Sequence, residues 1–313
     1  MRAIMVAAVA ALSAGVVAGA VSGSPAGASR IAFTNNRSIW IIGSDGSGLR
    51  QVTHAGYSDA AVAWSRDGAL LAFTRYTHPP CPEDQTQGDL YLIGSNGKNQ
   101  RRLTKTGCMF SPPSHPAFAP KGQKLAFDDD KGIHVAQGPG WQPRSALAHG
   151  LLPSWAPDAQ RLVEASTPNS IEVLDTVTHA TRSLGQGDFA QWSHDGKHIS
   201  CVFSGNQIWT MDPNGGHRVH VTTAKGHVSS LSWSPGDDRL SFSAGDKTST
   251  SWVVRSTGGT PVKLGAGAFP GWAPDGTELS VEVNDALIYL VRADGGGRHL
   301  LTKGFSAAWS PTG

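Results

Sequence analysis

The sequence has little charge and few cysteines. Only 16% of its 313 residues are charged, the formal net charge is +2, and there are 3 cysteines. No run of Lys or Arg and no one-sided basic stripe occurs, which argues against nucleic-acid binding. A G-x-S-x-G motif is absent, so we do not expect serine-hydrolase chemistry. The 12 histidines show no H-x-H or H-E-x-x-H spacing, so the sequence predicts no local metal site and no cofactor.

What the chain does contain is a phrase of the type Trp-Ser/Ala-Pro-Asp-Gly that returns seven times. In each of the first six copies, an apolar residue follows seven positions after the phrase begins. After the first copy, the spacings are 37, 37, 41, 39 and 37 residues, a period typical of four-stranded propeller blades. The phrases begin at Trp64, Phe118, Trp155, Trp192, Trp233, Trp272 and Trp309, and the apolar residues are Leu71, Leu125, Leu162, Ile199, Leu240 and Leu279.

The seventh copy, at Trp309, lacks its continuation in the last residues of the chain. Residues 30–33, with the sequence Arg-Ile-Ala-Phe, resemble the second strand of the other repeats. We therefore expect the two ends of the chain to share one blade and to close the ring, which leaves few unpaired strand edges. The sequence thus predicts an all-β, seven-bladed β-propeller. Six blades are the alternative if the degenerate copy at Phe118, with Lys121 in place of Asp, is a long loop.

The first 28 residues are predicted to be a signal peptide, and residues 29–313 a single propeller domain. Arg2 precedes an uncharged, Ala/Val-rich run from 3 to 20, and A-x-A cleavage patterns occur at 18–20 and 26–28. The second pattern would release a chain that begins at Ser29. Export is the expected outcome, to the periplasm, the envelope or the medium. An uncleaved N-terminal anchor is the alternative.

Two of the three cysteines are predicted to form a disulfide. In an up-and-down blade, the loop between strands two and three and the connection to the next blade lie on the same face. Cys81 falls in such a loop and Cys108 in the connection that leaves the same blade, so the two side chains should meet in an oxidising compartment. Cys201 lies inside a predicted strand and is expected to be a buried free thiol.

The Asp-Gly pairs and the tryptophans of the repeat are predicted to be structural. Asp67-Gly68, Asp195-Gly196 and Asp275-Gly276 lie between two strands, where tight turns need Asp and Gly. Calcium would need several carboxylates in one loop, and here they are spread one per turn. The repeat tryptophans should pack between blades.

The repeated phrase resembles the TolB-type propeller repeat. The likeness rests on Leu-Ala-Phe after the phrase, on Ile-Trp-Ile-Ile-Gly-Ser-Asp-Gly at 39–46 and on Arg-Leu-Thr at 102–104, and it spans the whole mature chain. This resemblance implies a WD-like propeller fold but not one function. Similar repeats occur in TolB itself, in prolyl-oligopeptidase-like peptidases and in oligogalacturonate-lyase-like enzymes. The α/β domain that precedes the TolB propeller has no counterpart after the leader here.

The candidate binding site lies at the loops that precede the innermost strands, around a central funnel. Polar residues that differ from blade to blade occur there on a constant framework, which suits recognition. The insertion at 76–89, with Pro79 and Pro80, would form a stiff rim. The candidate residues are His54, Asp59, His115, His149, Asp188, His227 and Lys303.

We therefore expect a monomeric, exported and non-catalytic interaction module. Its partner would be an envelope or extracellular protein, with a glycan as a further possibility, and the mature chain would have no transmembrane span. The alternative is a polysaccharide-active enzyme that resembles oligogalacturonate lyase. In that case His115, His149 and His227 would bind a divalent metal in the funnel.

Overall fold

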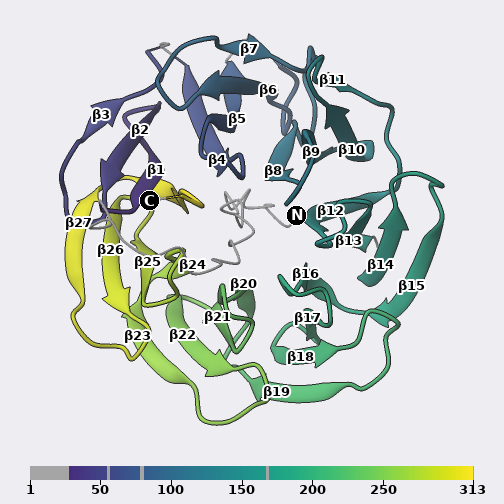
Figure 1. The fold of residues 1–313 in the computed structure, drawn as a ribbon, viewed down its shortest axis with the longest axis vertical. Coiled ribbons are helices and arrows are strands. Elements are labelled where there is room, and N and C mark those ends of the chain that lie inside the picture. The colour runs from purple at the N-terminus through teal and green to yellow at the C-terminus, as the bar shows by residue number, and fades with distance from the viewer. Residues whose placement is uncertain (1–27, 55–56, 78–80, 167–168, 313) are drawn as a thin grey trace.

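The structure is a closed ring of seven blades. The computed structural model describes residues 28–54, 57–77, 81–166 and 169–312, so residues 1–27 of the predicted leader lie outside the described part. Within these residues, seven four-stranded antiparallel sheets surround one axis (Figure 1). The predicted all-β, seven-bladed propeller is confirmed. The Phe118 copy forms a blade of its own, so the six-bladed alternative is wrong.

Each blade runs from an innermost strand at the axis to an outer strand at the rim. We number the blades along the chain. Blade 1 contains β28 (Phe305–Trp309), β1 (Arg30–Asn35), β2 (Ser38–Gly43) and β3 (Arg50–Gln51). Blade 2 contains β4 (Ser58–Trp64), β5 (Leu70–Thr77), β6 (Gln87–Gly94) and β7 (Arg101–Arg102). Blade 3 contains β8 (Ser114–Phe118), β9 (Lys124–Asp129), β10 (Gly132–Gln137) and β11 (Gln142–Pro143). Blade 4 contains β12 (Gly150–Trp155), β13 (Arg161–Ser166), β14 (Ser170–Asp175) and β15 (Thr181–Gln186). Blade 5 contains β16 (Asp188–Trp192), β17 (Ile199–Phe203), β18 (Gln207–Met211) and β19 (Val219–Thr223). Blade 6 contains β20 (Val228–Trp233), β21 (Arg239–Ala244), β22 (Thr250–Arg255) and β23 (Val262–Ala266). Blade 7 contains β24 (Ala268–Trp272), β25 (Glu278–Val283), β26 (Leu287–Arg292) and β27 (His299–Lys303).

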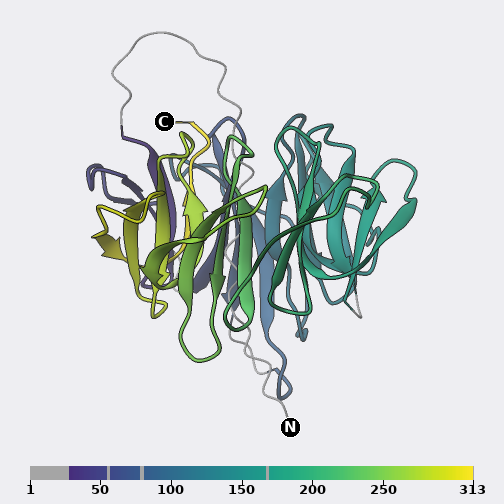
Figure 2. The same cartoon turned by 90° about the horizontal axis from the view of Figure 1, so that it is seen from below.

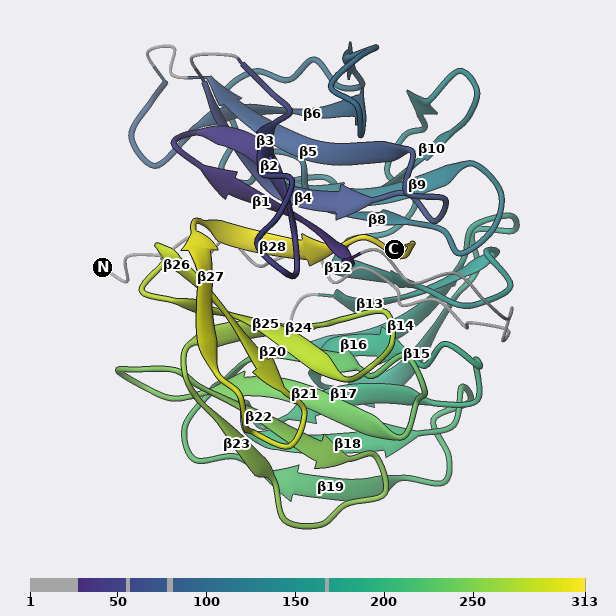
Figure 3. The same ribbon diagram turned by 60° about the vertical axis from the view of Figure 1, so that its left-hand side comes forward.

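The constant seven-residue step is the register of the first hairpin in each blade. Trp64 pairs directly with Leu71, and Trp233 with Leu240. The same pairing joins the two ends of the chain, because Trp309 in β28 faces Ile31 in β1. Figure 3 shows β28 lying beside β1, so the predicted shared blade is confirmed. A ring closed in this way leaves only the outer strands as edges.

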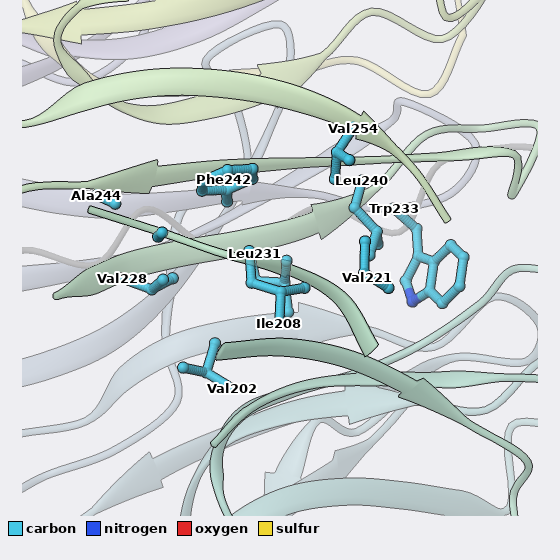
Figure 4. Packing of buried hydrophobic residues seen from close by; sticks show 11 residues of the cluster. Val202, Ile208, Val221, Val228, Leu231, Trp233, Leu240, Phe242, Ala244 and Val254 are labelled. Atoms are coloured by element: carbon cyan, nitrogen blue, oxygen red, sulfur yellow. The ribbon is translucent and has the colours of Figure 1, made fainter. Parts of the chain in front are cut away.

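Neighbouring blades pack through buried apolar side chains. At the junction of blades 5 and 6, Ile208 and Val221 form one cluster with Leu231, Leu240 and Phe242 (Figure 4). All five are at most 4% exposed. Burial of such side chains supplies roughly 1.5–3 kcal/mol each, so these junctions hold the ring together.

The repeat tryptophans lie between blades, as predicted. The indole nitrogen of Trp64 donates to the Ala308 carbonyl at 2.9 Å, and that of Trp155 to the Ala117 carbonyl at 2.9 Å. Each acceptor belongs to the innermost strand of the preceding blade. A basic side chain from the preceding blade also covers several of the rings, an attraction that the sequence analysis missed. These pairs are Arg30 over Trp64, Lys124 over Trp155, Arg161 over Trp192 and Arg239 over Trp272.

The Asp-Gly turns are structural, as predicted. A side-chain oxygen of Asp67 accepts hydrogen bonds from the Ser65 hydroxyl and the Ala69 amide, and Gly68 has a φ of 67°. Asp195 accepts equivalent bonds, from Ser193 and the Lys197 amide. These bonds satisfy turn groups that would otherwise need water.

The ring has two different faces. The innermost strands begin at one face, which we call the entry face, together with the loops between second and third strands and the connections between blades. The opposite face, the turn face, carries the tight hairpins and the end of β28. Figure 2 shows the ring from the side, with the strands running between the two faces. No helix in the described ranges is long and apolar enough to span a membrane.

Candidate functional site

The insertion at 76–89 is the longest insertion relative to the repeat. It lies on the entry face, and a disulfide holds it in place. Cys81, in the β5–β6 loop, is bonded to Cys108, in the connection from β7 to β8, with a Cα–Cα distance of 5.6 Å. Thr86 and Met109 exchange backbone hydrogen bonds beside it. The predicted disulfide is therefore confirmed. Cys201 is a buried free thiol, and burial raises its pKa to about 12.

Removal of this disulfide is expected to destabilise the protein. Replacing both Cys81 and Cys108 by Ala opens a link between residues 27 positions apart. The chain-entropy relation gives a loss of about 3–4 kcal/mol for a loop of this size. Urea denaturation of the double variant measures the loss, with Cys201→Ala as a control that leaves the link intact. An unchanged unfolding midpoint in the double variant would show that the link adds no stability.

The seven predicted residues are spread around the ring at the entry end of its strands. Asp59, His115 and Asp188 are inside innermost strands rather than before them, and Lys303 ends the outer strand β27. No hydrogen bond or ion pair among the described residues joins two of the seven. His54, His149, His227 and Lys303 are exposed, His115 and Asp188 are half-buried, and Asp59 is buried.

Asp59 is occupied by a structural partner. Its two carboxylate oxygens accept hydrogen bonds from Nε and Nη2 of Arg75 at 2.6 and 2.8 Å. Asp59 is 1% exposed and Arg75 4% exposed, and the guanidinium also lies over the rings of Phe73 and Tyr91. Removing either partner would leave a buried charge unpaired, which is costly. Asp59 therefore holds β4 to β5 and is not free to bind a ligand directly.

His115 forms a histidine–aspartate pair at the start of β8. Its Nδ1 lies 2.9 Å from both carboxylate oxygens of Asp128, which is 2% exposed. Burial of the ring opposes the charged form, but the charge of Asp128 and its hydrogen bond outweigh burial and raise the pKa of His115. No hydrogen bond to Nε2 occurs among the described residues. The pair can therefore present Nε2 to a ligand, as a donor when the ring is protonated and as an acceptor when it is neutral.

The surroundings of this pair extend over blades 2 to 4. The phenol of Tyr76, from β5, interacts with the Ser114 side chain, and burial raises the pKa of Tyr76. Asp128 also accepts a 2.6 Å hydrogen bond from the amide of Leu152, in β12 of the next blade. Exposed aromatic side chains lie on the same face, at Tyr57 before β4 and Phe110 before β8.

The left-handed backbone of His115, with a φ of 48°, belongs to the fold rather than to the site. Six of the seven innermost strands have a non-glycine residue with positive φ three positions before the end of the strand, where the pairing register shifts. Such bulges re-aim side chains and terminate pairing. The residues are Ala61, His115, Leu152, Phe189, Phe269 and Ser306.

Sequence reasoning missed the carboxylates that hold these bulges from the preceding blade. Asp128 accepts the Leu152 amide, and Glu282 accepts the Ala307 amide at 2.8 Å. Both occupy the third position after the apolar residue of the seven-residue step, so an alignment of the repeats on that residue could have found them. A third buried carboxylate, Glu164, has no hydrogen-bond partner among the described residues.

The residues present do not fit a metal held by His115, His149 and His227. His115 lies in the innermost strand of blade 3, and His149 and His227 precede the innermost strands of blades 4 and 6. In the part of the chain that the structure describes, no three side chains of His, Cys, Asp or Glu are grouped to hold a metal ion.

Comparison with known structures supports the fold at low sequence identity. TolB from Acinetobacter baumannii matches with a TM-score of 0.57 and 16% identity, over 90% of this chain and 66% of that one. An oligogalacturonate lyase in complex with manganese gives 0.63 and 13%, over 89% and 86%. A chain of the mitotic checkpoint complex gives 0.63 and 17%, over 84% and 87%. No protein-family model and no curated protein matches the sequence.

These likenesses confirm the TolB-like propeller fold and decide nothing about activity. The chain spans just under two thirds of the TolB structure that it matches. The three structures differ in what they do, although they share this architecture.

Proposed function

We propose that the protein is an exported, non-catalytic binding module that holds its ligand at the entry face. The observation that carries this proposal is His115, fixed by Asp128 at an innermost strand with its Nε2 unpaired among the described residues. The disulfide-linked insertion lies on the same face, whereas the turn face repeats one Asp-Gly turn design. Specific groups on a rigid scaffold are typical of recognition sites. The disulfide supports export, because such bonds persist in oxidising compartments.

Binding is tested with the mature chain from Ser29, immobilised through its C-terminus. The end of β28 lies on the turn face, so a tag there leaves the entry face free. His115→Ala is expected to weaken binding of a captured envelope or medium component roughly 10-fold or more, since hydrogen bonds to charged groups contribute about 1.5–3 kcal/mol. Biolayer interferometry gives the two affinities.

His217→Ala is the matched control. His217 also pairs with an aspartate, Asp212 at 2.9 Å, but it lies in an exposed turn on the turn face. Its replacement should leave affinity unchanged. Equal losses in both variants, or none in His115→Ala, would contradict the proposed site.

The polysaccharide-active alternative predicts another outcome. A protein retained by the wild type and lost with His115→Ala would support an interaction module. Retention of a glycan without cleavage would identify the ligand class. Release of shortened products from a polysaccharide panel by the wild type would instead support an enzyme.

A further inference from the structure

Glu164 occupies a position that the fold normally gives to an apolar residue. It is the second residue after Leu162 in β13, and the corresponding side chains pack toward the preceding blade. Phe127, for example, clusters with Leu90 and Leu92 of blade 2. The other six residues at this position are Phe33, Phe73, Phe127, Cys201, Phe242 and Val281. Blade 4 therefore has a carboxylate at a position where the other six blades have an apolar side chain.

The structure gives this carboxylate no compensating contact. Glu164 is 0% exposed, and neither side-chain oxygen has a hydrogen-bond partner among the described residues. It lies against Gly150 of β12, where a Cβ atom would collide with Oε2. A buried, unpaired carboxylate is strongly disfavoured when ionised, so stability does not explain its presence.

The charges around Glu164 are of the same sign. Asp128, from β9 of blade 3, and Glu172, its cross-strand partner in β14, both disfavour a further negative charge. Burial, Glu172 and Asp128, in that order, raise the pKa of Glu164 to about 7.

The other titratable groups nearby do not neutralise Glu164. His115 of β8 is engaged by Asp128, and His134 of β10 is engaged by Asp129. β12 itself has no titratable residue, and the His149 that precedes it is exposed. Across the next junction, Asp188 of β16 caps its own strand through the Phe189 amide.

We infer that Glu164 is a proton-dependent switch of the blade 3–blade 4 junction, which controls the Asp128 contacts to His115 and Leu152. When Glu164 is neutral, the junction is packed and Asp128 holds both the histidine and the bulge of β12. Ionisation places a second carboxylate beside Asp128 in the same buried junction. The repulsion is relieved when the entry ends of the two blades separate and the Leu152 amide loses its acceptor.

The functional consequence rests on the proposed function. A ligand that needs the fixed His115 would bind more tightly below about pH 7, where Glu164 holds its proton. Entry-face binding would thus be linked to proton uptake at a residue that the ligand does not touch.

Hydrogen exchange of the Leu152 amide tests the switch without any ligand. The mature chain is measured by NMR at pH 6 and pH 8.5, with correction for intrinsic exchange. We expect the wild type to lose Leu152 protection roughly 10-fold or more between the two values. Glu164→Phe and Glu164→Gln should abolish this loss.

Glu282→Gln is the matched control. Glu282 is another buried glutamate whose pKa burial raises to about 7, and it binds the Ala307 amide at the junction of blades 7 and 1. Replacement of Glu282 should alter the exchange protection of the Ala307 amide and leave the pH dependence of the Leu152 protection intact. Leu152 protection that does not change with pH, or that changes equally in Glu164→Phe, would overturn the switch. Either result would leave the His115 affinity test unaffected.

Discussion

Replacement of Glu164 by Phe is expected to raise the free energy of unfolding at pH 8 by about 3 kcal/mol or more. The change removes the cost of a buried carboxylate ion and adds apolar burial at a position where four other blades have Phe. For a protein of this size, such a gain corresponds to a rise in Tm of roughly 5 °C or more. Replacement of the proposed switch residue would then stabilise the fold, as expected of a residue kept for function.

The stability gained by Glu164→Phe should depend on pH, and the direction of this dependence follows from proton linkage. Below pH 4.5, the ordinary pKa, folded and unfolded chains both bind the proton, so ionisation of Glu164 does not contribute to the stability. Between 4.5 and about 7 only the folded chain holds the proton, so stability falls as pH rises. Above about 7 the loss is complete, at about 3 kcal/mol from roughly 1.36 kcal/mol per pKa unit.

Urea denaturation of wild type and Glu164→Phe at pH 5 and pH 8 measures both effects. Glu164→Gln separates them, because it removes the charge without adding apolar surface. Glu282, His115 and His134 also have raised pKa values and contribute to the pH slope in all three proteins, so the wild type should lose more stability between pH 5 and pH 8 than either variant. Equal pH dependence in wild type and Glu164→Phe would show that Glu164 does not hold its proton near neutrality.

A chain that ends at Gly304 is expected not to fold. It lacks β28, whose Trp309 faces Ile31 and donates to Ser280 at 3.1 Å. Truncation opens the ring, leaves β1 as an unpaired edge and removes a buried strand. The total stability of a domain is only about 5–15 kcal/mol, which the loss of a complete innermost strand exceeds.

A chain that ends at Ser310 is the control for this truncation. It keeps all of β28 and loses only the residues beyond Ser310, including the Thr312 contact to Arg30 at 3.3 Å. Circular dichroism and thermal melting should show a cooperative transition for the control and none for the shorter chain. A folded, cooperative protein ending at Gly304 would show that the shared blade does not close the ring.

The sequence predicted the candidate site only in outline. It located the entry face, because polar residues vary there on a constant repeat, and it included His115. It also included Asp59, which the structure shows in an ion pair with Arg75. Asp128 and Glu164 escaped notice: an alignment of the repeats marks their positions, but the role of a carboxylate inside a strand depends on the blade packed against it.

The sequence by itself determined the hairpin register, the shared blade and the disulfide, and it predicted seven blades with six as the alternative. These features follow from spacing along the chain, because six blades are local units of consecutive strands and the incomplete copies at the two chain ends complement each other. Only the tertiary structure decided which groups meet across blade junctions. Asp128 holds Leu152 from 24 residues away, and Glu164 faces blade 3 with no hydrogen-bond partner in the part of the chain that the structure describes. Such contacts depend on how two separately built sheets pack, and no spacing within one repeat encodes them.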